Sequence, residues 1–296
     1  MPIKKLTKDE VVADMVNLGI KPGDTVWLTA NLGRIGVIES RRETAKNFID
    51  CILECVGEEG TLVALSYTDG TFIKDPKQED AFHSEKKSYA GALPNAMLAY
   101  PNSFRSQHPM CSVVAIGKNG KYVTDGHDEN SYSYEPVKKL MELNGKCVTL
   151  GCAYETPGYT TTHWAETKLG FHQKLIFTKS LYKAGYKTEN GEFKLYRRKD
   201  PGMCTENFPT LLGHYLRHGV LQTGMIGSAY TIIGEAKKLY DVDIKILKQD
   251  KQFHLCKKND CFQCRMNRWD TAYFAPFYFA KKLLLALSRR LKTRLS

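Results

Sequence analysis

The sequence of 296 residues contains no long apolar run and no N-terminal segment typical of exported proteins. No stretch approaches the ~20 apolar residues of a membrane-spanning helix. The N-terminus, MPIKKLTKDE, becomes polar at once, so we expect no signal peptide. Nine cysteines without a secretion signal indicate reduced thiols. We therefore expect a cytoplasmic protein.

The sequence also lacks internal repeats, low-complexity linkers and any recognisable nucleic-acid-binding motif. Its charge is nevertheless one-sided, with 43 Lys and Arg against 32 Asp and Glu and a net charge of +11. A basic protein attracts anionic partners, but basic residues outside a nucleic-acid-binding motif do not identify a nucleic-acid-binding protein. We therefore expect small anionic substrates and no nucleic-acid partner.

What the sequence does contain is the pattern of a layered α/β protein. With 42% hydrophobic residues, the chain can bury a large core. Thr7-x-x-Glu10 and Ser40-x-x-Glu43 have the form of capping boxes, and each precedes apolar residues at helical spacing. Short apolar runs predict core strands, and other patterns predict further strands and helices. The core strands are expected at 25–29, 62–67, 112–116 and 147–150, further strands at 175–178 and 192–196 with a turn at 189–191, and helices at 208–217 and 228–240.

The most informative segment is 151–166, GCAYETPGYTTTHWAE. A short apolar strand leads into a loop rich in Gly, Pro and Thr, which opens into a helix carrying Thr160, His163 and Glu166. Residues three apart share a helix face, so a hydroxyl, an imidazole and a carboxylate point the same way. This combination suits acyl transfer. Two alternatives are a surface His–Glu pair and half of a zinc site, although the H-E-x-x-H pattern is absent.

Three other segments combine a turn or a polar loop with a strand. They are 22–36, PGDTVWLTANLGRIG; 57–68, GEEGTLVALSYT; and 105–117, RSQHPMCSVVAIG. In the last of these, Arg105, Ser106 and His108 can donate hydrogen bonds to phosphate or amide oxygens. The alternative is an ordinary loop with a capped turn.

Taken together and in this order, the four segments resemble the aminoglycoside 3-N-acetyltransferase-like family of acyl-CoA-dependent N-acyltransferases. That family shows a G-D-x-V strand ending in H-S-S-L or H-A-S-L, then G-T-L-V, G-x-L-P, R-S-x-H-P-x-x-S-x-x-A-x-G, and L-x-L-G leading to T-x-x-H-x-A-E. The matching segments here are 23–26, 60–63, 91–94, 105–117, 150–151 and 160–166. The resemblance implies a layered α/β/α sheet of the aminoglycoside 3-N-acetyltransferase type, which we expect within residues 1–250. A Cys-rich extension, 251–296, follows it and departs from the family pattern.

The resemblance also implies roles for individual residues. His163 is expected to be the general base when an acceptor amine attacks the thioester, and Glu166 to orient His163 and hold its tautomer. Thr160 is expected to donate its hydroxyl to the developing oxyanion. The expected contacts of acetyl-CoA, the co-substrate, are Thr29, Ala30, Asn31, Leu32, Ser106, His108 and Ser112.

The sequence departs from the family pattern at several positions. Thr29 and Asn31 stand where H-S-S-L has its His and its second Ser, and Glu135-Pro136 replaces a Ser-Pro element. Tyr159 precedes the catalytic helix where Asp or Asn is common. These changes lie where acceptor and donor would touch, so they concern the substrates more than the reaction type.

The expected function is N-acetylation, or transfer of another short acyl group, from acyl-CoA to an amino sugar. A polycationic aminoglycoside prefers a carboxylate-rich cleft, whereas this chain is basic. We therefore expect a nucleotide-linked amino sugar destined for a surface glycan. Alternatives are an aminoglycoside 3-N-acetyltransferase conferring antibiotic resistance, and a non-catalytic, metal-stabilised binding protein on the same scaffold. Direct transfer is expected because no cysteine lies inside the His163 motif, although Cys111 and Cys152 keep a covalent route open.

The C-terminal extension contains a cluster of potential metal ligands in the segment HLCKKNDCFQC. His254, Cys256, Cys261 and Cys264 can supply the four ligands of a tetrahedral zinc site. The spacing of the cysteines is also similar to that of plant-type ferredoxins, which need a fourth Cys. A structural zinc ion is the preferred metal, since acyl transfer needs no redox centre. Reduced free thiols are the alternative.

The last 24 residues, YFAPFYFAKKLLLALSRRLKTRLS, are first aromatic, then rich in leucine, then basic. Leu283, Leu284, Leu287 and Leu291 lie on one face of a predicted helix. Such a helix suits an anionic membrane surface, which would place the enzyme at the inner face of the membrane. The alternative is a helix docked on the catalytic domain. The sequence does not indicate an oligomeric state.

Overall fold

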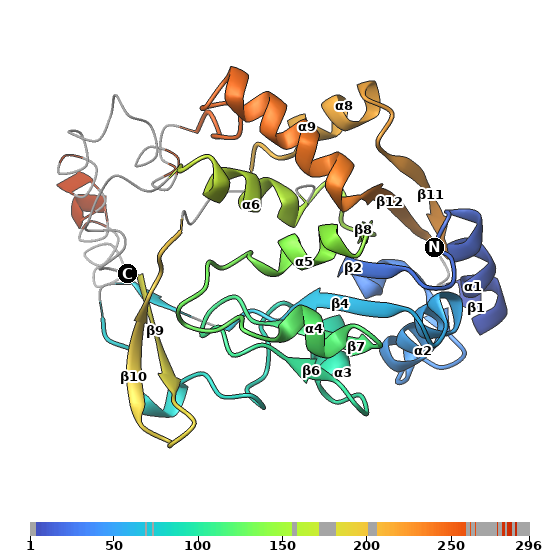
Figure 1. Ribbon diagram of the computed structural model, residues 1–296, viewed down its shortest axis with the longest axis horizontal. Coiled ribbons are helices and arrows are strands. Elements are labelled where there is room, and N and C mark those ends of the chain that lie inside the picture. The colour runs from blue at the N-terminus through green and yellow to red at the C-terminus, as the bar shows by residue number, and fades with distance from the viewer. Residues whose placement is uncertain are drawn as a thin grey trace.

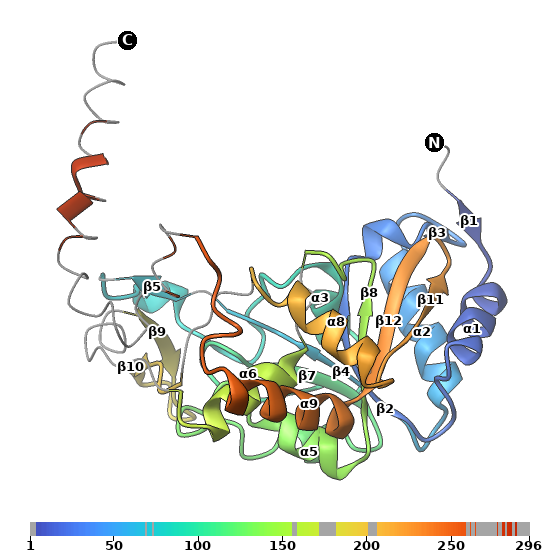
Figure 2. The same cartoon turned by 90° about the horizontal axis from the view of Figure 1, so that it is seen from above.

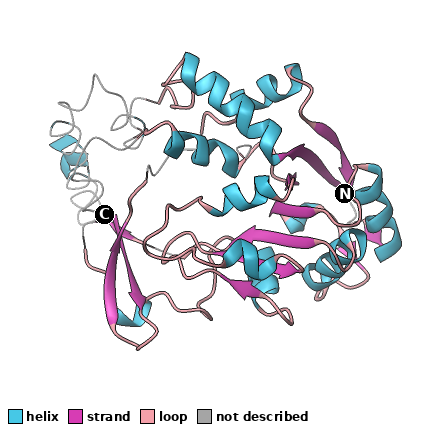
Figure 3. Cartoon of the chain, viewed as in Figure 1, coloured by secondary structure: helices cyan, strands magenta, loops and turns pink. Residues whose placement is uncertain are grey.

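A mixed β-sheet lies between two layers of helices in the computed structural model (Figures 1 and 3). The structure describes residues 4–68, 70–72, 74–155, 159–171, 182–200 and 206–258, together with 261, 264, 277, 280, 281, 283–285 and 288. Within these residues the main sheet has seven strands in the order β11-β12-β8-β2-β4-β7-β6. They are β2 (Thr25–Ala30), β4 (Thr61–Leu65), β6 (Phe104–Arg105), β7 (Val113–Gly117), β8 (Lys146–Leu150), β11 (Gln222–Ile226) and β12 (Ala229–Glu235).

The directions of the central strands bring several loops to one edge of the sheet. Strands β8, β2 and β4 are parallel, whereas β7 runs antiparallel to β4. The C-terminal ends of the three parallel strands therefore meet the beginning of β7. Ligands of α/β proteins bind at such an edge.

The two faces of the sheet support two separate layers of the core, because successive strand residues point in opposite directions. Val26 and Leu28 belong to one apolar cluster and Trp27 to the other. Figure 2 separates α1 and α2 from α5, α6 and α9 across the sheet. The first layer holds α1 (Lys8–Asn17), α2 (Thr44–Val56) and α3 (Ala92–Leu98); the second holds α4 (Gly120–Thr124), α5 (Pro136–Glu142), α6 (Thr160–Lys168), α8 (Pro209–Arg217) and α9 (Ala236–Gln249). The predicted layered α/β/α fold is confirmed.

Two smaller sheets and two short 3₁₀ helices complete the described elements. β1 (Lys5–Leu6) pairs with β3 (Val37–Ile38), and β5 (Thr71–Phe72) joins the hairpin of β9 (Tyr182–Lys187) and β10 (Phe193–Arg197). The hairpin stands at the left of Figure 1, and its turn includes the predicted residues 189–191. The 3₁₀ helices are η1 (Leu32–Arg34) and η2 (Gln78–Asp80).

The local sequence patterns predicted most elements but not all of them. The capping box at Thr7 and Glu10 is confirmed, with both reciprocal hydrogen bonds present. The second capping box is wrong. Ser40 Oγ donates to the Glu43 carboxylate at 3.3 Å, but α2 begins only at Thr44, with Glu43 as its N-cap. Thr44 Oγ1 instead donates to the Ser40 carbonyl at 2.9 Å, which closes a turn before the helix.

The helix predicted at 228–240 is also wrong in its first half. Residues Ala229–Glu235 form β12, which is inserted between β11 and β8, and the helix α9 begins at Ala236. Ile232 and Ile233 pack on opposite faces of the sheet, as adjacent residues of a strand do. The strand predicted at 175–178 lies outside the described residues.

The C-terminal extension is described only in part. Leu283 and Leu284 are helical and 62% and 67% exposed, while Leu287, Leu291 and the final basic residues lie outside the described residues. Within the described chain, no helix combines the length and apolar character that crossing a membrane requires. The boundary at residue 250 and the membrane contact stay predictions.

Candidate active site

The start of α6 lies at the edge of the sheet where β2, β4 and β8 end, and it holds the residues singled out in the sequence. Tyr159 is extended, with φ −77° and ψ 151°, and precedes the first helical residue, Thr160. The hydroxyls of Thr161 and Thr162 donate to Asp243 of α9 at 2.8 and 3.3 Å. These two bonds fix the first turn of the helix, because both donors are buried.

His163 and Glu166 form the predicted pair. His163 Nδ1 lies 3.1 Å from Glu166 Oε2, and both side chains are buried. An ionised carboxylate can only accept a hydrogen bond, so Nδ1 carries the proton. In the neutral imidazole Nε2 is then the nitrogen without a proton, and this is the atom that can act as a general base.

Aromatic rings enclose the imidazole of His163. The ring of Tyr134 stacks on it with centroids 4.4 Å apart and an interplanar angle of 16°, and Phe208 lies 5.1 Å away. The Tyr134 hydroxyl is 3.2 Å from that of Tyr67, which follows β4. His163 is thus held between rings, with 8% of its surface exposed. Thr160 occupies the turn before it and is 6% exposed.

Glu166 has a second histidine beside it. His254 Nε2 lies 3.7 Å from Glu166 Oε1, and the two residues are 2% and 1% exposed. Neither Glu166 Oε1 nor His254 Nδ1 has a hydrogen-bond partner among the described residues. Burial lowers the pKa of His254 from its ordinary value. The carboxylate of Glu166 therefore lies between two imidazoles, of which the sequence motif contains only one.

Asp243 is a buried acid directly behind α6. It accepts hydrogen bonds from Thr161, Thr162 and the hydroxyl of Tyr215, and none of its surface is exposed. Burial raises the pKa of Asp243 from 3.8 to about 7, while the three hydrogen bonds oppose this rise. Asp243 consequently changes protonation near neutral pH.

This raised pKa predicts how stability depends on pH. The unfolded chain releases the proton near pH 3.8, whereas the folded protein keeps it up to about pH 7. The contribution of this group to stability is therefore complete below pH 4 and is lost as the pH rises through 7. Between pH 5 and pH 8 the free energy of unfolding should fall by roughly 3 kcal/mol because of this group.

Urea unfolding of the wild type and of Asp243→Asn at both pH values measures this effect. The amide cannot titrate, so the variant should lose less stability between pH 5 and pH 8 than the wild type does. Equal losses in the two proteins would show that Asp243 has an ordinary pKa in the fold.

The first group of predicted CoA contacts lies on the loop after β2, beside the end of β8. Thr29 and Ala30 are half-buried, Asn31 is exposed and Leu32 is buried. Asn31 Oδ1 accepts from the Gly33 amide at 3.2 Å, so it stabilises the loop itself. At Gly151, where φ is +68°, a Cβ would lie 3.0 Å from the Asn31 carbonyl oxygen. Glycine thus allows the two loops to approach closely.

The second group is less accessible than the sequence suggested. His108 has none of its surface exposed, accepts from two backbone amides through Nδ1 and lies 3.1 Å from the Tyr196 hydroxyl through Nε2. Burial lowers the pKa of His108 well below its usual value. Ser112 is equally buried and donates to the Ser66 carbonyl at 2.7 Å. Both residues support the loop from within, and direct contact with CoA would require the site to open.

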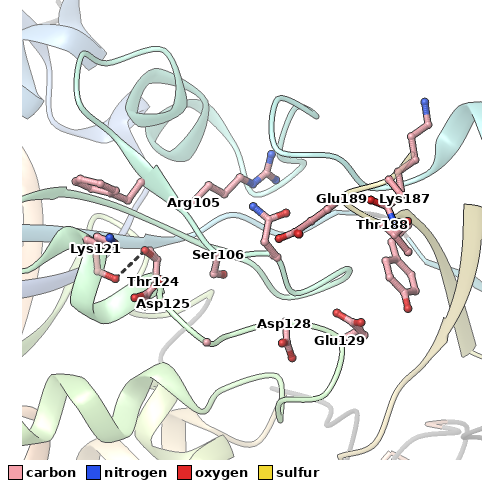
Figure 4. A pocket seen from close by; sticks show the side chains of 15 residues that line it. Arg105, Ser106, Lys121, Thr124, Asp125, Asp128, Glu129, Lys187, Thr188 and Glu189 are labelled. Carbon is pink, nitrogen blue, oxygen red and sulfur yellow. Dashed lines mark hydrogen bonds between the residues drawn. The ribbon is translucent and has the colours of Figure 1, made fainter. Parts of the chain in front are cut away.

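Ser106 is the residue of this group that lines a pocket (Figure 4). The pocket has a volume of about 640 Å³ and lies between the end of β6, the loop after α4 and the hairpin of β9 and β10. Ser106 Oγ lies 2.9 Å from His127 Nδ1 and accepts from the Val113 amide. The pocket is lined by the carboxylates of Asp125, Asp128, Glu129 and Glu189 and by the cations of Arg105, Lys121 and Lys187.

The expected metal ligands are brought together only in part. The sulfur atoms of Cys256, Cys261 and Cys264 all lie within 4.8 Å of one another. His254 is not a member of this group, because its ring lies against Glu166 instead.

A covalent route through Cys111 is disfavoured by the surroundings of this residue. Burial raises the pKa of the Cys111 thiol, which makes it a poor nucleophile.

Sequence reasoning did not place Tyr134, Phe208, Asp243 and His254 in the active site. They lie between 29 and 91 residues from His163 in the chain, on separate elements. No local spacing connects them with the T-x-x-H-x-A-E motif, and only the packing of the second helix layer brings them there.

Comparisons with known proteins give a consistent family assignment. The sequence profile of the aminoglycoside 3-N-acetyltransferase family matches residues 28–248. The aminoglycoside N(3)-acetyltransferase VIII of Streptomyces fradiae is 28% identical over 180 residues, which cover 55% of this chain and 61% of that protein. The chain thus spans about three fifths of the length of this relative.

Solved structures with the same fold include complexes with bound molecules. A structure of AAC-IIIb in binary complex with CoASH has a TM-score of 0.70 at 23% identity, covering 83% of this chain and 97% of that one. A structure of a mutant of AAC(3)-IVa in complex with a gentamicin has a TM-score of 0.75 at 19% identity, covering 90% of this chain and 98% of that one. Since the family profile matches well over half of the sequence, the chain belongs to the aminoglycoside 3-N-acetyltransferase family.

Proposed function

We propose that this protein transfers an acetyl group from acetyl-CoA to an amine of an aminoglycoside. The observation that carries the proposal is the buried pair of His163 and Glu166, which leaves Nε2 of the imidazole as a base at the edge of the sheet. The family assignment supports the same chemistry. The solved relatives described with CoASH and with a gentamicin support these two substrate classes.

The proposed reaction is a direct transfer. The amine nitrogen attacks the thioester carbonyl while His163 Nε2 accepts its proton. The C–N bond forms, the C–S bond breaks, and CoA leaves as a thiolate that takes up a proton to become CoASH. Thr160 is placed on the turn before His163, where its hydroxyl can donate to the oxyanion of the tetrahedral intermediate. The positive end of the α6 dipole acts in the same direction.

The pocket beside Ser106 is a candidate site for the acceptor, since it contains carboxylates that can bind amines. The run from Asp125 to Glu129, together with Glu189, contributes four carboxylates to it. Its volume of about 640 Å³ suits a drug-sized ligand. The loop that lines the pocket continues to Tyr134, which covers His163. The carboxylates outnumber the cations of Arg105, Lys121 and Lys187 by one, so this pocket is slightly acidic although the chain as a whole is basic.

Release of CoA tests the function. Purified protein is incubated with acetyl-CoA and either gentamicin-type aminoglycosides or nucleotide-linked amino sugars, and the free thiol is followed with DTNB. We expect release with the aminoglycosides and a product heavier by one acetyl group. The His163→Ala variant gives the background rate of thiol release.

Two results would contradict the proposal. Release with nucleotide-linked amino sugars alone would replace the acceptor class with the one expected from composition. A folded protein that releases no CoA with any amine would indicate a binding protein on this scaffold.

A further inference from the structure

The segment after α9 leads from the catalytic carboxylate directly to the cysteine cluster. His254 packs on Glu166, and its ring stacks on Phe171 with centroids 5.7 Å apart. Two residues later, Cys256 enters a small cluster with Leu255, Cys261 and Cys264. The active site and the cysteines are therefore joined by a single short turn.

The cysteine cluster has features of a metal site. Cys256 and Cys264 are 4% and 1% exposed, and Cys261 is half-buried. The Cys256 amide donates to Cys264 Sγ at 3.2 Å, which is the kind of outer-shell hydrogen bond that orients a metal ligand. In a tetrahedral zinc site with Zn–S bonds of about 2.3 Å, sulfur atoms are about 3.8 Å apart. The three sulfur atoms, which lie within 4.8 Å of one another, need to close by at most about 1 Å.

Among the described residues, the cysteine cluster has few apolar contacts. Leu255 is the only large apolar residue in it among the described residues. A segment without a core of its own is commonly fixed by a metal ion, whose binding energy contributes to folding. Three thiolates occupy three corners of a tetrahedron and leave the fourth to a ligand outside this group.

We propose that Cys256, Cys261 and Cys264 bind one zinc ion, and that this ion holds His254 against Glu166 as a positioning residue. The metal site stands on the cysteines alone, whereas the role of His254 rests on the proposed acetyltransferase function. When zinc fixes this segment, the distance between His254 Nε2 and Glu166 Oε1 needs to shorten from 3.7 Å to that of a hydrogen bond. That bond keeps the other carboxylate oxygen, Oε2, directed at His163 Nδ1.

Metal analysis of the full-length protein tests the site. We expect about one zinc ion per chain in the wild type, and a loss of most of it in Cys261→Ser. Cys261 is half-buried, so this variant should remain folded. Lys257→Ala, an exposed neighbour in the same segment, should keep its zinc. Iron in place of zinc, a disulfide between two of these cysteines, or equal zinc in Cys261→Ser would overturn the proposal.

Kinetics of His254 variants test the link to the active site. His254→Phe should keep its zinc and lower kcat about tenfold, while KM for acetyl-CoA changes less than about twofold. His254→Gln retains a side-chain donor and should recover most of the lost kcat. Cys261→Ser should show the same loss in kcat as His254→Phe. Unchanged kcat in His254→Phe, or no recovery with Gln, would overturn the positioning role. An inactive wild type that still binds zinc would instead contradict the proposed function.

Discussion

Replacing His163 with alanine is expected to lower kcat for acetyl transfer by roughly two to four orders of magnitude, the usual contribution of a general base. The imidazole of this residue of α6 has a ring nitrogen, Nε2, that can accept the proton of the attacking amine when the ring is neutral. The nearby carboxylate of Glu166 is buried behind it and already accepts from Nδ1. Steady-state release of CoA measures the effect, and KM for acetyl-CoA should change little because no binding contact to CoA is assigned to this ring.

A matched control is His218→Ala. His218 is an exposed histidine at the end of α8, next to Lys245 at 3.2 Å. Its loss should leave kcat unchanged. Because His163 is enclosed by Tyr134 and Phe208, thermal unfolding must show that His163→Ala is folded at the assay temperature. Near-normal turnover in the folded variant would eliminate the assignment of His163 as the base.

The part of the site that the sequence predicted correctly is the part that depends on local geometry. His163 and Glu166 are three residues apart, and any helix over this segment brings their side chains to the same face. The observed contact of 3.1 Å needs only the helix that the loop before it predicts. The strands that end at this edge were likewise predicted from short apolar runs, because strands buried on both faces have almost continuous apolar sequences.

The part that the sequence could not predict depends on contacts between distant residues. Tyr134 reaches His163 from the loop before α5, and Asp243 reaches the start of α6 from α9. Neither has a pattern of its own. His254 shows the limit most clearly, because its position near three cysteines suggested a fourth metal ligand. The fold turns its ring toward Glu166 instead.

The wrong helix at 228–240 has a similar cause. Alanine and isoleucine residues occur in helices and in buried strands alike, and a short apolar run does not distinguish them by periodicity. The position of β12 between β11 and β8 decided the outcome, since a buried strand there completes the hydrogen bonds of both neighbours.

The burial of His108 and Ser112 could not be predicted from the sequence either. Both residues match a family motif, but only the fold shows that their polar atoms form hydrogen bonds inside the protein.

Replacing Thr160 with valine is expected to lower kcat by about 10²- to 10³-fold, which corresponds to the loss of one oxyanion donor. Valine has nearly the same shape as threonine, so the change removes the hydroxyl and leaves the packing at the start of α6 intact. Thr160→Ser keeps a hydroxyl at the same place and should retain most of the activity. The measurement is kcat for CoA release at saturating acetyl-CoA.

Thr167→Val is the matched control for Thr160→Val. Thr167 is a buried threonine on the same helix, and its hydroxyl donates to the His163 carbonyl at 3.0 Å rather than toward the substrate. Loss of a backbone-bonded hydroxyl should change kcat by less than about threefold, because the carbonyl already belongs to the helix. If Thr160→Val and Thr167→Val lose activity equally, the loss is caused by a less stable α6 and not by a missing oxyanion donor. The oxyanion would then need another donor, and the backbone amides at the start of α6 would be the next candidates.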